Sequence, residues 1–142
     1  MINSIKEWFK AAKPNPSTVD VCVQIGCHYE EVSEMSAVLN YDVEYMLAAT
    51  ALDYEMYYSS YLGSLLEELS ADARVELLDA LCDQVVTAVG VAYMMGMDIE
   101  GALAEVNRSN WSKFEGGVPV FNEHGKIAKG AEYTPPELSD YI

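Results

Sequence analysis

The chain has 142 residues, enough for one domain with its own core, and 51% of them are hydrophobic, which excludes a disordered acidic tail. Eight Lys and Arg against 23 Asp and Glu give a formal net charge of −15. Such a charge argues against binding a nucleic-acid backbone through bulk electrostatics.

The N-terminal segment "MINSIKEWFKAAKP" predicts an amphipathic helix over residues 1–13. Its apolar side carries Ile2, Ile5, Trp8 and Phe9, and Pro14 ends it. The charges are scattered, unlike those of a signal peptide, and the polar face is less basic than that of a typical membrane anchor. We expect this helix to dock on the domain and not on a membrane.

Three long helices are predicted next, over residues 19–39, 43–69 and 71–95. A break near "NYD" separates the first two, Ser70 caps the third and Gly96 closes it. A shorter helix follows, with Asp98 at its N-cap. These elements predict a helical bundle over residues 19–107.

The pattern changes after Trp111, where glycines, prolines and short apolar alternation predict a small β-hairpin or an ordered loop. The hairpin would pair residues 118–121 with residues 126–128 around "NEHG". We therefore predict one all-α domain over residues 1–142, a four-helix-type bundle with a basic arm and tail over residues 108–142.

Three glutamates lie within one stretch of the first long helix, "CHYEEVSEM". At about 100° per residue, Glu31 and Glu34 lie roughly 60° apart, in the same sector as Cys27, Met35 and Val38. We expect both carboxylates on the apolar, packed side of the helix, where they must be protonated or paired. Glu30 is either a further ligand or a solvent-facing neighbour, and we favour the neighbour.

A second acidic set lies in "ARVELLDALCDQVV", about forty residues later. Glu76, Asp79 and Asp83 fall within roughly 60° of one another at helical spacing. Such a set is often a solvated face, but two acidic helices facing each other in a bundle can also hold a divalent metal. Carboxylate oxygens suit Mg²⁺ or Mn²⁺.

Cations are rare between Pro14 and Asn107, where Arg74 is the single one. Four cluster in the arm, namely Arg108, Lys113, Lys126 and Lys129. They are the candidates for binding a polyphosphate beside a metal, with Asn110 as a hydrogen-bonding partner for phosphate or sugar. The three cysteines form no zinc-ligand spacing, and reduced thiols in the cytoplasm are the natural interpretation.

Six motifs of the chain together resemble those of the all-α nucleoside triphosphate pyrophosphohydrolases, in the MazG-like and phosphoribosyl-ATP pyrophosphohydrolase-like branch, which bacteriophages often carry. The motifs are "EEVSE", "ELLDALCD", "VGVAYMMGMD", "EVNRSNWSK", "GKIAKG" and "YTPPEL". The resemblance implies Mg²⁺ binding by an ExxE and an ExxD, matched by Glu31 with Glu34 and by Asp79 with Glu76 or Asp83. We favour Asp79 and Asp83. It also implies a homodimer or homotetramer.

The implied reaction cleaves a (d)NTP between the α and β phosphates, giving (d)NMP and pyrophosphate, with Glu34 accepting the proton of the attacking water. Because phage members of this family often act on guanine nucleotides, the resemblance favours a purine, (d)GTP, as the substrate. Two alternatives stay open: a non-enzymatic acidic mimic of nucleic acid that blocks a basic partner, and a degenerate relative that senses nucleotide without turnover.

Overall fold

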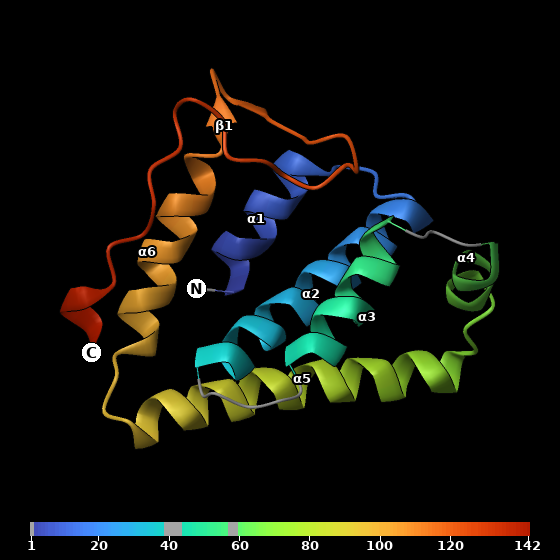
Figure 1. The fold of residues 1–142 in the computed structure, drawn as a ribbon, viewed down its shortest axis with the longest axis horizontal. Coiled ribbons are helices and arrows are strands. Elements are labelled where there is room, and N and C mark those ends of the chain that lie inside the picture. The colour runs from blue at the N-terminus through green and yellow to red at the C-terminus, as the bar shows by residue number, and fades with distance from the viewer. Residues whose placement is uncertain (1, 39–43, 57–59) are drawn as a thin grey trace. The chain divides into compact units, whose positions relative to one another are not determined.

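The computed structural model describes residues 2–38, 44–56 and 60–142. Its helices are α1 (Ile2–Ala12), α2 (Thr18–Val38), α3 (Glu44–Met56), α4 (Ser60–Glu67), α5 (Ala71–Met94) and α6 (Ile99–Trp111). Two short strands, β1 (Phe114–Glu115) and β2 (Val118–Pro119), and a 3-10 turn η1 (Ser139–Tyr141) follow (Figure 1). The prediction of an all-α protein is confirmed.

The chain divides into two compact units. The first comprises residues 1–14, 69–120 and 127–142, and the second residues 15–68 and 121–126. The predicted break near residues 40–42 lies outside the described residues. So does the 57–59 segment of the helix predicted over residues 43–69.

The core of the first unit forms around α1. Trp8 and Ala12 are buried against Phe114, with Phe9 and Ile127 packed around them. The Trp8 indole Nε1 donates a hydrogen bond of 2.8 Å to the carbonyl oxygen of Asn110 on α6, so its polar atom is satisfied in the core. Helix α1 therefore docks on the protein through its aromatic side, as predicted.

Local capping chemistry sets the ends of α5 and α6. The Ser70 hydroxyl accepts a bond of 3.1 Å from the Ala73 N–H, and the Asp98 carboxylate accepts one of 3.0 Å from the Gly101 N–H. Gly96 takes a positive φ of 76° one position after Met95, the C-cap of α5. Both predicted N-caps and the predicted stop are confirmed.

The arm begins with a hairpin that the sequence prediction missed. Antiparallel β1 and β2 are joined by Gly116 and Gly117, whose φ angles of 55° and 83° are easily adopted by glycine. The pairing predicted around "NEHG" is present only as isolated backbone hydrogen bonds. The Ala128 N–H donates to the Val120 carbonyl at 2.8 Å, and the Asn122 N–H to the Lys126 carbonyl at 2.9 Å.

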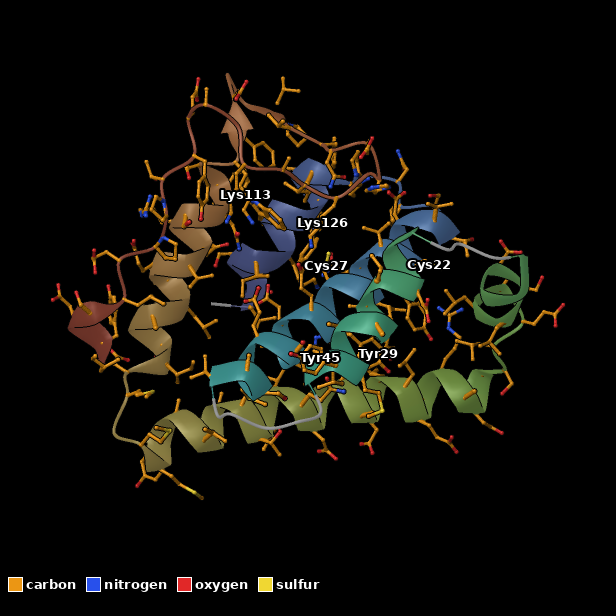
Figure 2. The ribbon with its side chains drawn as sticks, in the orientation of Figure 1. Cys22, Cys27, Tyr29, Tyr45, Lys113 and Lys126 are labelled. Atoms are coloured by element: carbon orange, nitrogen blue, oxygen red, sulfur yellow. The ribbon has the colours of Figure 1, made fainter. Side chains whose placement is uncertain are left out.

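In the second unit, α2 and α3 run antiparallel and side by side (Figure 1). Most of the buried positions of α2 are small, and the small ones recur with the four-three spacing of a coiled-coil seam. They are Cys22, Gly26, Ser33 and Ser36; Val23 is also buried, and Ala51 is the buried residue of α3. At the intervening seam position, Tyr29 stacks on Tyr54 with ring centroids 5.8 Å apart (Figure 2 labels Tyr29 and Cys22).

This seam corrects the predicted packing face of α2. Met35 and Val38, expected on the packed side, are 52% and 79% exposed. Small side chains let two helix backbones approach closely, so they form the contact in preference to the larger apolar residues. None of the helices in the described ranges is long and apolar enough to cross a membrane.

Candidate functional site

The acidic turn of α2 lies beside the α2–α3 seam. Glu30 and Glu34 line a shallow hollow together with Ser33, and Ala48 and Ala51 of α3 close its other side. Glu31 and Glu34 are exposed, and Glu30 is half-buried. The structure therefore places two of the three glutamates at the rim of one hollow with an apolar wall.

The expectation that Glu31 and Glu34 sit on the packed side of α2 is wrong, because the helix packs through its small residues instead. An exposed carboxylate stays hydrated, so burial supplies no reason for these two to bind a metal. Repulsion between like charges remains, because Glu30 and Glu34 are four positions apart and therefore neighbours on the helix surface.

Lys126 relieves part of this repulsion. Its ammonium donates a hydrogen bond to the Glu30 carboxylate from 96 positions away in the chain (Lys126 is labelled in Figure 2). The two side chains are only 27% and 42% exposed, which makes the pair less screened than a surface ion pair. Glu30, expected to be a solvent-facing neighbour, is thus the residue that joins the acidic turn to the arm.

Sequence reasoning missed this contact because the two residues are far apart in the chain. The available signal was the charge distribution: Arg74 as the single cation between Pro14 and Asn107, and a cluster of cations in the arm. Such a distribution favours a long-range pairing, but it does not select Lys126 over the other three.

Glu76, Asp79 and Asp83 are exposed on α5. Helices α5 and α2 belong to different compact units. Among the described residues, no group of three or more His, Cys, Asp or Glu side chains is arranged to hold a metal.

Arg108 binds protein groups on two sides. Its Nε and Nη2 donate to the two Glu105 oxygens at 2.8 and 2.7 Å, and Nη1 donates to the Thr134 hydroxyl at 2.6 Å. Nη2 also reaches the Pro135 carbonyl at 2.9 Å. The Arg108 hydrogen bond, helped by the backbone N–H of Glu137, lowers the pKa of Glu105 to about 2.

The remaining predicted phosphate ligands lie around the end of α6 and along the arm. Asn110 accepts the Trp8 indole N–H with its backbone carbonyl, not with its side chain. The Lys113 ammonium lies 5.9 Å from the Trp8 ring centroid, and the Lys129 ammonium lies 5.2 Å from that of Tyr133. In the first unit, the structure brings Asn110 and Lys113 to the same tryptophan.

Comparisons of the chain with family models, with curated proteins and with solved structures gave no match. The resemblance to the pyrophosphohydrolases therefore rests on the sequence motifs and stays a prediction.

Proposed function

We propose that the protein is a Mg²⁺-dependent nucleoside triphosphate pyrophosphohydrolase, with Mn²⁺ able to replace Mg²⁺, that converts a (d)NTP to (d)NMP and pyrophosphate. The supporting observation is the pairing of Lys126 with Glu30. Lys126, which is expected to bind phosphate, thus contacts α2, the helix that is expected to bind the metal. Its partner Glu30 directly precedes Glu31 in the sequence.

In this proposal the metal site takes its carboxylates from the two acidic motifs of the sequence. Glu31 and Glu34 of α2 form one pair, and Asp79 of α5 with Asp83 or Glu76 forms the other. Their donor atoms are all carboxylate oxygens, the type that Mg²⁺ prefers, so the residues fit the ion chemically. When bound, the metal neutralises phosphate oxygens and lowers the pKa of the attacking water.

Glu34 has the best position for a general base among the three glutamates of α2. It lines the hollow beside the α2–α3 seam, where a water molecule can be held between an apolar wall and a carboxylate. Its carboxylate accepts the proton of the attacking water as the bond to the α phosphorus forms and the pyrophosphate leaves.

Lys126, Lys113, Lys129 and Asn110 are proposed to bind the polyphosphate and the sugar. Arg108 already donates to Glu105, Thr134 and Pro135, so it can join them through its second Nη1 hydrogen or by exchanging a tail partner for a phosphate oxygen. We further propose the bundle arrangement and the homodimer or homotetramer that the resemblance implies, with (d)GTP as the preferred substrate.

An assay with the eight common NTPs and dNTPs tests the proposal. The purified protein is incubated with each nucleotide and Mg²⁺, and the products are separated by ion-exchange chromatography. NMP with pyrophosphate is the expected result. NDP with orthophosphate contradicts the proposed bond cleavage, and binding without turnover of any nucleotide identifies the degenerate sensor instead.

One observation favours a second function, the acidic mimic of nucleic acid. Glu31, Glu34, Glu76, Asp79 and Asp83 are all exposed, as a mimic requires. Thermal stabilisation by Mg²⁺ supports the enzyme, whereas metal-independent binding of a basic DNA-binding protein at low salt supports the mimic.

A further inference from the structure

Lys126 is held at its backbone as well as at its side chain. The Asn122 side-chain oxygen accepts hydrogen bonds from the His124 N–H at 3.0 Å and from the Lys126 N–H at 2.9 Å. The Asn122 N–H in turn donates to the Lys126 carbonyl at 2.9 Å. Gly125, with a φ of 76°, supplies the left-handed residue that this tight turn needs.

The side chain of Lys126 is then directed by Glu30. A free lysine side chain samples many rotamers, and ordering it costs conformational free energy. Here the turn fixes the Cα and Glu30 fixes the ammonium, so that cost is met when the protein folds and not when a ligand binds.

We infer that Glu30 is a positioning residue that, with Asn122, holds the Lys126 ammonium beside the acidic turn of α2 to receive an oxygen of the substrate's polyphosphate. This inference rests on the proposed function and deepens it, because it gives a role to the one glutamate of α2 outside the ExxE pair. An ammonium has three donors and can bind a carboxylate and a phosphate oxygen at once.

Glu30 lines the same hollow as Glu34, and the Lys126 ammonium contacts Glu30, so one residue links Lys126 to the space in which the reacting water is proposed to lie. A cation there also keeps the acidic turn from repelling a polyphosphate. The pairing therefore places a fixed positive charge beside carboxylates that would otherwise disfavour an anionic substrate.

A double-mutant cycle tests the role of Glu30. We expect Glu30→Gln to raise KM for the nucleotide about three- to tenfold with little change in kcat, because ground-state binding is weakened. Lys126→Met should raise KM at least as much. The double variant should match Lys126→Met alone, because Glu30 acts only through Lys126.

Glu123→Gln is the matched control. Glu123 lies in the same turn, is an acid 86% exposed at its side chain, and lies 3.4 Å from the His124 imidazole. Its substitution should leave KM and kcat unchanged. A KM effect equal to that of Glu30→Gln would mean that net charge near the arm, and not a positioned lysine, decides binding.

Calorimetric binding of pyrophosphate in the presence of Mg²⁺ gives a second measurement that needs no turnover. One set of results would support the inference while the proposed function fails. The wild type would turn over no nucleotide but bind pyrophosphate, and Glu30→Gln would weaken that binding in a chain with Lys126 but not in the Lys126→Met variant. Glu30→Gln effects that add to those of Lys126→Met, or a loss of kcat as large as that of Glu34→Gln, overturn the inference. So does a wild type that binds no pyrophosphate.

Discussion

Arg108 holds Glu105 through two hydrogen bonds of 2.8 and 2.7 Å while its remaining donors reach Thr134 and Pro135 in the C-terminal tail. The motif "EVNRSNWSK" thus contacts the motif "YTPPEL" directly. Ser109 strengthens the contact, because its hydroxyl donates to the Thr134 carbonyl at 2.8 Å. Two of the motifs on which the resemblance rests therefore have a structural reason to occur together, apart from any substrate.

We predict that Glu105→Gln loosens the tail. The variant loses the charge-assisted bonds to Arg108 and weakens the acceptor of the Glu137 N–H, now 2.9 Å away. Hydrogen exchange at residues 134–141 should become several-fold faster, whereas exchange in α2 should not change. Glu132→Gln, an exposed acid in the same tail segment, is the control and should leave exchange unaltered.

The same contact predicts a pH dependence. The pKa of Glu105 falls from an ordinary 4.5 to about 2 in the folded protein. A lowered pKa means that the contact stabilises the fold fully above pH 4.5 and loses this effect as the pH falls toward 2. Carbon-13 NMR of the carboxyl groups should show one glutamate titrating near 2, and Arg108→Gln should return it toward the ordinary value.

Capping residues and the helical period were sufficient to predict most of the first unit. Ser70, Gly96 and Asp98 act locally, within a few positions of the element that they limit, so the sequence reveals them directly. The hairpin of the arm is harder to predict from the sequence. Both "GG" at Gly116 and Gly117 and "NEHG" carry the residues of a hairpin turn, so the sequence does not show which of them joins the two strands.

The contact face of α2 was predicted wrongly for a different reason. Periodicity locates large apolar residues, but most of the buried positions of α2 are glycine, serine and cysteine, which carry little hydrophobic signal. The Lys126–Glu30 pair was beyond prediction because it depends on where the arm turns back.

Ser36→Leu tests the small-residue seam. Ser36 is 7% exposed, so the larger leucine side chain cannot be accommodated without moving α3, and overpacking of this kind costs about 1–3 kcal/mol. Urea denaturation should show that loss in the free energy of unfolding. Gln24→Leu, on an exposed position of α2, should change it little; equal losses from both would place the seam elsewhere.

Trp8→Phe tests the docking of α1. The variant keeps an aromatic ring but loses the bond to Asn110, which together with the smaller ring should lower the free energy of unfolding by about 1–3 kcal/mol. Ile2→Ala, at a position 65% exposed on the same helix, should stay within about 0.5 kcal/mol. A neutral Trp8→Phe would show that α1 contributes little to the core.

The central claim is tested most directly by phosphorus-31 NMR of dGTP incubated with the protein and Mg²⁺, alongside the Glu34→Gln variant. The proposal predicts dGMP and pyrophosphate from the wild type, no reaction when EDTA removes the metal, and a loss of at least about a hundredfold in kcat for Glu34→Gln, the usual lower range for removing a general base. Pyrophosphate release at the wild-type rate by Glu34→Gln, or orthophosphate as the first product, would contradict it.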